Sequence, residues 1–320
     1  MMKPANKRIM VFSGRSNPVL GNEIVEELSI DAGKVKISQF TDGEIYVKFL
    51  ESVRGADVFL IQTFSDPVNK NIMELLIMAD ALKRASAKRV SAVIPYYGYS
   101  RQDKKTTSRE PITAKLVADL LQNTGIDRVV TMDLHAGQIQ GFFDIPVDHL
   151  TALKILVSHF SKMKLQDLVV VSPDVGRVKL AKKFSDQLGS ELAILHKTRP
   201  DHNLVEVGQV VGEVKGKVAL LVDDMIDTAG TITEGAKTLI KKGATEVYTC
   251  ATHGVLSGQA LERIEASAIK ELVLTNTIPL EPKKKLDKIT ILSIAPLFAQ
   301  AINNIYEDES VSTLFGDDGF

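Results

Sequence analysis

The stretch from Val218 to Thr231 constrains the fold more than any other part of this 320-residue chain. It opens with a short run of apolar residues that ends at Val222 and has the length and composition of a buried β-strand. Acidic residues follow, then small and hydroxyl-bearing ones, and from Thr231 apolar residues recur at helical spacing. A strand that passes through a short loop into a helix is the unit of α/β proteins. We therefore expect an α/β fold with central, mainly parallel sheets.

The loop in this stretch has a distinct chemical character. Its carboxylates belong to Asp223, Asp224 and Asp227, and they can bind vicinal sugar hydroxyls or a hydrated divalent metal. Its backbone N–H groups lie at the positive end of the next helix, where they can bind a phosphate. The residues expected around that phosphate are Thr228, Ala229, Gly230 and Thr231. The sequence thus favours a sugar-phosphate site, and the alternative is an ordinary turn with a threonine cap and solvated acids.

Length and composition limit the class of protein. The chain is long enough for two domains, which we place at residues 1–149 and 150–320, with a C-terminal tail able to pack on the first. Lys plus Arg number 39 and Asp plus Glu 40, a net charge of −1 that argues against a nucleic-acid partner. No segment has the apolar length of a signal peptide or membrane span. Cys250 is the single cysteine, so we expect no disulfide and a cytoplasmic location.

The same pattern of elements occurs twice along the chain. The segment that begins at Ala87 parallels the one that begins at Ala244, and each is preceded by a helix and a strand. Strands are predicted at 8–13, 57–62, 89–95, 128–132, 168–172, 192–196, 217–222, 246–251 and 271–275, and helices at 69–86, 113–123, 151–160, 176–188, 231–242 and 257–266. A duplicated domain explains the parallel economically, although α/β units also share such patterns by chance.

A second group of polar residues follows another predicted strand, at 128–132. Asp133 and His135 are two residues apart, so on an extended chain they share one side. A carboxylate and an imidazole in that arrangement can hold a divalent ion, directly or through water, and a hydrogen-bonded structural pair explains them equally well. Asp174 follows the strand at 168–172 and precedes a glycine, where it can cap a helix.

The loop at 96–109 interleaves aromatic and cationic residues. Its polar members include Arg101, Gln102 and Arg109, and the combination suits a purine ring with its phosphates. A solvated basic loop is the alternative. Residues 212–218 have the wrong spacing for a P-loop, so any ATP would bind without a Walker motif.

These motifs together resemble those of the ribose-phosphate diphosphokinases, also called phosphoribosyl diphosphate synthetases, of the phosphate-activated bacterial type. The metal signature of the family is similar to residues 133–146, and its ribose 5-phosphate loop to residues 223–231. Its nucleotide loop resembles residues 101–105 with 108–109, its adenine clamp from a neighbouring subunit 40–44, and its mobile catalytic segment 195–199. The likeness spans nearly the whole chain.

The resemblance implies two tandem type I phosphoribosyltransferase-like domains and a reaction in which ATP and ribose 5-phosphate give phosphoribosyl diphosphate and AMP. It implies Mg²⁺ held near Asp133, His135 and Asp174, and transition-state charge supplied by Lys197 and Arg199. The implied ATP-binding residues are Phe40, Asp42, Glu44, Arg101 and Gln102.

The chain departs from the family at two positions. The family often has two glycines where this sequence has Gly176 followed by Arg177, which could add a cation near the phosphates. Asp42 stands in the adenine clamp, where asparagine is also common.

The resemblance also implies assembly and control. The family forms hexamers built from dimers, activated by phosphate and inhibited by ADP at a site between subunits. The matching residues here are Ser52, Arg54, Gln140, Asp148, Ser310 and Ser312. Two other functions stay open at this point: a phosphoribosyltransferase that consumes phosphoribosyl diphosphate, and a non-catalytic paralogue that binds an active synthetase.

Overall fold

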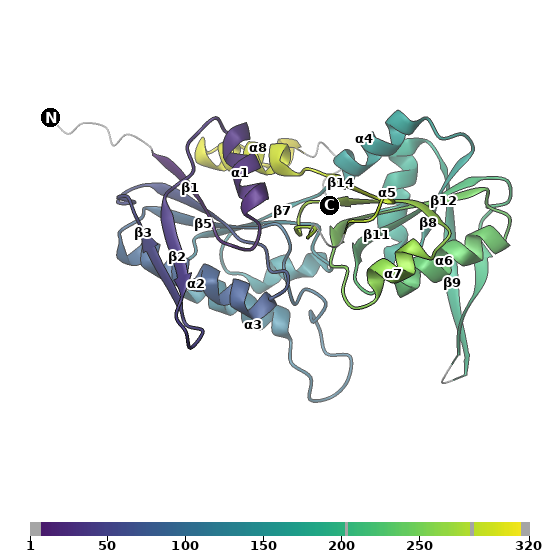
Figure 1. The fold of residues 1–320 in the computed structure, drawn as a ribbon, viewed down its shortest axis with the longest axis horizontal. Helices are drawn as coiled ribbons and strands as arrows, with labels where there is room; N and C mark the ends of the chain where they lie inside the picture. The colour runs from purple at the N-terminus through teal and green to yellow at the C-terminus, as the bar shows by residue number, and fades with distance from the viewer. Residues whose placement is uncertain (1–7, 202–203, 282–284, 315–320) are drawn as a thin grey trace. The chain divides into compact units, whose positions relative to one another are not determined.

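The chain divides into two compact units (Figure 1). The computed structural model describes residues 8–201, 204–281 and 285–314, and the side chains of residues 197–208 lie outside the described part. The first unit contains the chain up to Thr151, a short return at Thr277–Pro279 and everything from Ser293 onward. The second contains Ala152–Asn276 and Leu280–Leu292. The chain first crosses from one unit to the other at Thr151–Ala152, whereas the expected boundary was 149–150. The segment from Ser293 groups with the first unit.

A parallel sheet forms the centre of the first unit, in the strand order β1-β4-β5-β6-β7. Its strands are β1 (Ile9–Ser13), β4 (Asp57–Ile61), β5 (Arg89–Ile94), β6 (Arg128–Met132) and β7 (Val147–Leu150). Every residue of β4 is buried, as expected for a strand covered on both faces. The antiparallel hairpin of β2 (Val35–Gln39) and β3 (Ile45–Phe49) forms a sheet of its own.

Helices cover both faces of this sheet. They are α1 (Pro18–Glu27), α2 (Val68–Arg84), α3 (Thr113–Asn123) and α8 (Ala295–Tyr306). Helices α1 and α8 lie side by side on one face, and α2 and α3 lie on the other (Figure 1). The apolar residues of α2 and α3 join those of the strands in one core.

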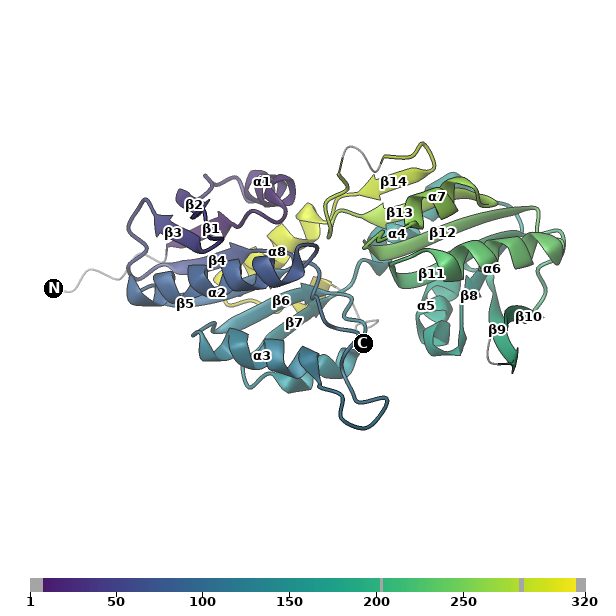
Figure 2. The ribbon, with the colours of Figure 1, turned by 60° about the horizontal axis from the view of Figure 1, so that its bottom comes forward.

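The second unit has a mixed sheet in the order β10-β9-β8-β11-β12-β13-β14 (Figure 2). Its strands are β8 (Leu168–Ser172), β9 (Glu191–Asp201), β10 (Leu204–Val211), β11 (Val218–Ile226), β12 (Glu246–Gly254), β13 (Ile269–Thr275) and β14 (Ile289–Leu292). Only the β9–β10 pair is antiparallel among these described strands. Its helices are α4 (Leu153–Met163), α5 (Val178–Leu188), α6 (Gly230–Lys241) and α7 (Ala260–Glu265). Helix α4 contacts α5, and α6 contacts α7.

Both units use the same order of elements, as the two similar halves of the sequence predict. In each, a strand and a helix precede a hairpin, and then come strand, helix, strand, helix and two strands. Strand β1 corresponds to β8, β4 to β11, β5 to β12, β6 to β13 and β7 to β14. The hairpins differ, because β9 joins its main sheet through β8 whereas β2 and β3 pair only with each other.

The two halves exchange their last helices. Helix α4 follows β7 in the chain but belongs to the second unit, where it contacts α5. Helix α8 follows β14 but belongs to the first unit, where it contacts α1. Phe298 and Ile302 of α8 are fully buried there, and the Ser293 hydroxyl donates a hydrogen bond of 2.6 Å to Oε2 of Glu23. Through these contacts the segment from Ser293 groups with the first unit, and it corresponds to the C-terminal tail that we expected to be able to pack there.

Several elements differ from the sequence-based expectation. Strand β11 continues past Val222 to Ile226, because Asp223 and Met225 still pair with Ala251 and His253 of β12. Strand β9 continues past His196 to Asp201, paired with β10. Helices α1 and α8 and strands β2, β3, β7, β10 and β14 were not predicted. No helix in the described part of the chain is long and apolar enough to cross a membrane.

Candidate active site

Asp223 and Asp224 lie within the last residues of β11, at the carboxyl edge of the second sheet. That edge is where open parallel sheets bind ligands. The side chain of Asp223 is 16% exposed and that of Asp224 only 7%. Backbone N–H groups hold both: Asp224 donates to Oδ1 of Asp223 at 2.8 Å, and Met225 donates to Oδ1 of Asp224 at 2.9 Å. Two of the predicted acidic residues, Asp223 and Asp224, therefore form a fixed, largely buried carboxylate pair.

Arg177 faces this pair from the turn between β8 and α5. Its Nε lies 3.2 Å from Oδ1 of Asp223, and its Nη2 lies 2.9 Å from Oδ2 of Asp224. Burial raises the pKa of the Asp223 carboxyl, the adjoining Asp224 raises it further, and Arg177 acts against both. Arg177, which could have added a cation near the phosphates, thus forms ion pairs with the carboxylates of Asp223 and Asp224.

The loop after β11 leads into α6 through Ala229. Ala229 occupies the N-cap position with φ of +60°, and its side chain makes no capping hydrogen bond. The N-cap residue is thus an alanine, where the alternative interpretation expected a threonine cap. Helix N-termini of this kind present N–H groups and a positive partial charge to an anion. Thr228 and Thr231 are exposed beside them.

Two contacts from β12–α7 hold this loop, and the sequence analysis missed both. The Ser257 hydroxyl donates to Oδ1 of Asp227, and the Ser257 N–H donates to the Asp227 carbonyl at 3.0 Å. Nη1 of Arg263 donates to the Thr228 carbonyl at 2.9 Å. Both residues belong to the helix predicted at 257–266, but nothing in that pattern points to the loop, so only the packing of α7 beside α6 reveals their contacts.

The predicted metal residues do not form a complete site in the described part of the chain. No group of three or more His, Cys, Asp or Glu side chains gathers there in a metal-binding arrangement. Asp133 has φ of +37°, so the chain is not extended at this residue, as the argument from spacing assumed. Asp133 and His135 belong to the first unit and Asp174 to the second. Oδ1 of Asp174 accepts hydrogen bonds from the N–H groups of Gly176 and Arg177, which is its capping role.

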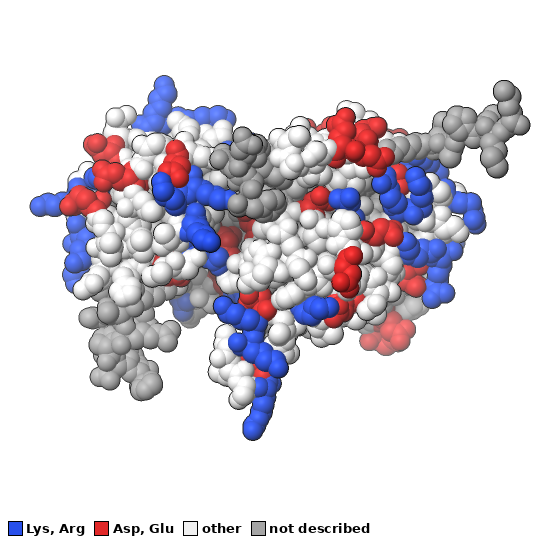
Figure 3. Space-filling view, turned by 180° about the vertical axis from the view of Figure 1, so that it is seen from behind, with Lys and Arg blue, Asp and Glu red and all other residues white. Residues whose placement is uncertain are grey.

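The predicted nucleotide loop projects from the first unit between β5 and α3 (Figure 1), and Lys and Arg side chains cover the projection (Figure 3). Arg101 and Gln102 are exposed on it. Oε2 of Glu110 closes the loop by accepting three hydrogen bonds of 2.7–2.9 Å from Thr106 and Thr107. These bonds lower the pKa of Glu110 from 4.5 to about 2, with the Thr107 backbone contributing most.

The predicted adenine clamp lies at the tip of the β2–β3 hairpin. Phe40 is 56% exposed and packs edge-on to Tyr46, with ring centroids 6.0 Å apart. The Glu44 N–H donates to Oδ1 of Asp42 at 3.1 Å, which fixes the turn. An exposed aromatic ring beside carboxylates is available to a purine from another molecule.

The predicted catalytic residues Lys197 and Arg199 have side chains outside the described part. Their backbone belongs to β9, where Lys197 pairs with Val207 of β10. The segment that resembles the family's mobile catalytic segment is therefore part of a strand in the β9–β10 hairpin.

The residues expected to bind phosphate between subunits form separate groups in the first unit. Nη1 of Arg54 donates to Oγ of Ser86 at 3.2 Å, and the exposed Ser52 accepts from Arg8 through its carbonyl. Gln140 contacts His149, Asp148 pairs with Arg128 at 2.6 Å, and Ser310 bonds to Ser312. No hydrogen bond or ion pair joins these groups within the described residues of one chain.

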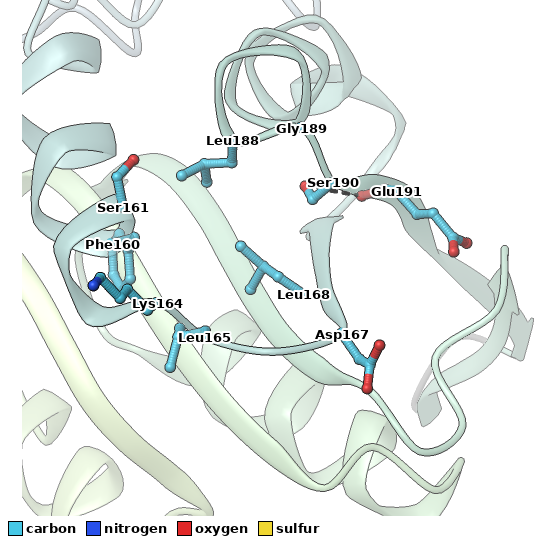
Figure 4. A pocket seen from close by; sticks show the side chains of 10 residues that line it. All are labelled: Phe160, Ser161, Lys164, Leu165, Asp167, Leu168, Leu188, Gly189, Ser190 and Glu191. Atoms are coloured by element: carbon cyan, nitrogen blue, oxygen red, sulfur yellow. Dashed lines mark hydrogen bonds between the residues drawn. The ribbon is translucent and has the colours of Figure 1, made fainter.

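A cavity of about 450 Å³ lies at the opposite edge of the second sheet, at the amino end of β8 (Figure 4). Phe160, Leu168 and Leu188 supply apolar lining, and Lys164, Asp167 and Glu191 lie at its rim. None of the predicted site residues lines it.

The repeated topology and the buried carboxylate pair followed by a helix N-terminus define two tandem type I phosphoribosyltransferase-like domains. Residues 9–125 match the N-terminal domain of ribose phosphate pyrophosphokinase, and residues 206–316 match the phosphoribosyl synthetase-associated domain. A ribose-phosphate pyrophosphokinase of Corynebacterium ammoniagenes is 56% identical over 97% of this chain and 98% of its own. One of Bacillus caldolyticus is 56% identical over 98% of this chain and 100% of its own.

The crystal structure of phosphoribosylpyrophosphate synthetase from Mycobacterium smegmatis superposes with a TM-score of 0.90 at 48% identity. The match covers 94% of this chain and 100% of the other. The chain belongs to the ribose-phosphate pyrophosphokinase family.

Proposed function

We propose that the second unit of this ribose-phosphate pyrophosphokinase binds ribose 5-phosphate through residues 223–231, and that the first unit supplies the nucleotide side. The enzyme transfers the β,γ-diphosphoryl group of ATP to the 1-hydroxyl of ribose 5-phosphate, giving phosphoribosyl diphosphate and AMP for nucleotide biosynthesis. The observation that carries the proposal is the N-terminus of α6, with alanine at its N-cap, directly after the buried pair Asp223 and Asp224.

The sugar phosphate fits this arrangement by chemistry. Asp223 and Asp224 accept hydrogen bonds from the vicinal hydroxyls of ribose. Thr228, Gly230 and Thr231 direct N–H and hydroxyl groups to the 5-phosphate at the positive end of α6. Arg263 and Ser257 fix the loop that joins the two halves of the site. The substrate is thereby held at both ends, which sets the direction of its 1-hydroxyl.

The transfer itself needs positioning and charge neutralisation. A bond forms between the ribose 1-oxygen and the β-phosphorus of ATP, and the bond from that phosphorus to the α-phosphate oxygen breaks as AMP leaves. We assign to Lys197 and Arg199 the role of neutralising charge on the β-phosphoryl oxygens in the transition state. We assign ATP to Arg101 and Gln102 and, from a neighbouring subunit, to Phe40, Asp42 and Glu44.

The family requires a divalent metal, and we propose Mg²⁺, with Asp133 and His135 as ligand candidates. Carboxylate oxygen and imidazole suit a divalent cation chemically. Because the described residues do not gather a complete ligand set, no step of the mechanism is assigned to the metal. A homohexamer, activation by phosphate, inhibition by ADP and a cytoplasmic location belong to the same proposal.

The proposal is tested by substrate-specific kinetics. Asp223→Asn and Asp224→Asn should raise KM for ribose 5-phosphate far more than KM for ATP, because the partners of these carboxylates are sugar hydroxyls. Glu234→Gln, which neutralises an exposed acid of α6, serves as the control. The assay follows AMP formed from ATP and ribose 5-phosphate. Pyrophosphate release that depends on an added nucleobase is measured in parallel, because it would indicate the alternative phosphoribosyltransferase activity. Equal effects on both substrates would assign the pair to a shared metal instead.

A further inference from the structure

The loop at 96–109, which we assign to the nucleotide, is held at one buried carboxylate. Asp103 is the only buried residue between Arg101 and Arg109, a stretch that the structure describes in full. Nε2 of Gln138 donates a hydrogen bond of 2.7 Å to Oδ2 of Asp103. Because a carboxylate withdrawn from water needs hydrogen-bond donors, this amide stabilises the buried position of Asp103. The loop is therefore held at Asp103, while the residues on either side of it face solvent.

Gln138 reaches the loop from a well-packed segment of the first unit. It lies in the short 3-10 helix η1 (Gly137–Phe142), which follows β6 and contacts α3. The next residue, Ile139, is fully buried in the core of that unit, and its N–H donates to the Ala136 carbonyl at 3.1 Å. The backbone beside Gln138 is thus fixed, and its side chain extends to the loop.

Other hydrogen bonds hold the loop near its end. The Ala114 N–H donates to the Gln102 carbonyl at 3.2 Å, and Glu110 accepts hydrogen bonds from within the loop. These contacts join the loop to itself and to the helix that follows it. The bond from Gln138 differs from them, because it joins the loop to a segment that comes after α3 and β6 in the chain.

The two segments that this bond connects have different roles in the proposed function. The candidate metal ligands Asp133 and His135 lie just before Gln138 in the chain. The residues that we assign to ATP directly precede Asp103. In a complex of Mg²⁺ with ATP the cation binds phosphate oxygens, so the groups that hold the cation and those that hold the nucleotide need a fixed separation.

We infer that Gln138 is a positioning residue for the nucleotide: its side-chain amide holds Asp103 and thereby fixes the distance between the ATP-binding part of the loop and the candidate metal ligands. This inference rests on the proposed function, since it takes the loop as the nucleotide side of the reaction. Asp103 serves as the acceptor of this hydrogen bond and contacts neither the metal nor the nucleotide. The bond should therefore work equally well with donor and acceptor exchanged.

The test exchanges donor and acceptor between the two positions without changing the size of either side chain. Gln138→Glu places a second carboxylate against Asp103, and the two repel each other. Asp103→Asn leaves a neutral acceptor in place of a charged one, which weakens the bond. The double variant Asp103→Asn/Gln138→Glu restores a hydrogen bond from an amide to a carboxylate, and the net charge of the pair is that of the wild type.

Binding of α,β-methylene ATP, a non-reacting analogue, is measured by calorimetry on the full-length protein with Mg²⁺ in excess. Gln138→Glu should raise Kd for the analogue roughly 3- to 10-fold, the size of one lost hydrogen bond. Asp103→Asn should lie between that variant and the wild type, and the double variant should return close to the wild type. Hydrogen exchange of residues 101–105, followed by mass spectrometry, should be faster in Gln138→Glu and normal in the double variant.

Gln122 provides a matched control, because its Nε2 donates to Oδ1 of Asp119 at 3.0 Å on α3. Gln122→Glu should bind the analogue as wild type does, and affinity for ribose 5-phosphate should be the same in every variant. The inference is overturned if Gln138→Glu binds the analogue with wild-type affinity, or if the double variant binds it more weakly than Asp103→Asn does. Wild-type protein that fails to bind the analogue in the presence of Mg²⁺ would overturn the proposed function itself.

Discussion

Single residues at the ends of strands decide what this protein can bind. Asp223 and Asp224 lie near the end of one buried strand of the second unit, and Asp174 follows its parallel neighbour. Arg177, three residues after Asp174, therefore contacts both carboxylates. In the first unit, Asp133 follows β6 in the same way, but its positive φ turns the chain there. The chemical types of these residues were visible in the sequence, whereas their directions depend on the local backbone.

Lys197 and Arg199 are predicted to act on the transition state. Replacing either with Ala should lower kcat by roughly 10²- to 10⁴-fold and leave the affinity for ATP within several-fold, as for loss of one oxyanion contact. Initial rates at saturating substrates, with ATP binding measured separately, check this. Lys215→Ala, an exposed cation in the turn before β11, is the control. A steep rise in Michaelis constants at unchanged kcat would contradict the assignment.

His135 is predicted to be a metal ligand. His135→Ala should shift the Mg²⁺ activation curve to higher concentration and leave the Tm of metal-free protein unchanged, because a half-buried ligand adds little to the apo fold. His149 gives the contrast, since its Nε2 accepts a 2.8 Å hydrogen bond from the Leu134 N–H. His149→Ala should lower the Tm. Loss of stability with a normal Mg²⁺ curve in His135→Ala would make that residue structural.

At the scale of elements, helices and strands with a strong apolar pattern could be predicted from the sequence, and those with a weak pattern could not. Helix α3 and strands β6 and β8 have the bounds expected from their apolar patterns. Helix α1 was missed because Val19 is 63% exposed and Gly21 interrupts its pattern. The hairpin β2–β3 was missed although half-buried and exposed residues largely alternate along it, because both strands are short and none of their residues is fully buried.

Only part of the candidate site could be predicted from the sequence. The carboxylates and the loop before α6 form one continuous stretch of sequence, so their grouping could be inferred. Arg177, Ser257 and Arg263 come from other segments, and only parallel pairing and helix packing bring them to that loop. The extension of β11 by Asp223–Ile226 depends on pairing with β12, which no local pattern encodes.

The nucleotide loop is predicted to keep its shape over a wide pH range. The pKa of Glu110 is lowered from 4.5 to about 2 in the folded chain, so its contribution is present above 4.5 and is lost as the pH falls toward 2. Glu110→Gln should therefore reduce the protection of the Thr106 and Thr107 amides from hydrogen exchange at neutral pH. Exchange measured by NMR, with the exposed acid variant Glu27→Gln as control, checks this. Unchanged protection would mean that the loop is held by other contacts.

At the scale of the whole molecule, the residues expected to bind phosphate lie apart within one chain. We therefore predict that a neighbouring subunit completes their site. Arg54→Ala should abolish activation by phosphate and weaken inhibition by ADP at saturating substrate. It should cost little stability, because its exposed guanidinium makes one 3.2 Å hydrogen bond to Ser86.

Phosphate-dependent initial rates and light scattering check this prediction. Lys88→Ala, another exposed cation of the same unit, should respond to phosphate as wild type does. A fully active, phosphate-regulated monomer would contradict both the shared site and the hexamer.

The exchanged helices also set the order in which the protein can be completed during translation. The second unit runs from Ala152 to Leu292 apart from one short excursion, so nearly all of it is available once that stretch has left the ribosome. The first unit is synthesised earlier, yet it lacks the helix that buries Phe298 and Ile302 beside α1 until the final residues emerge. Because domains fold as units once their segments are present, the half of the enzyme that is made first is finished last.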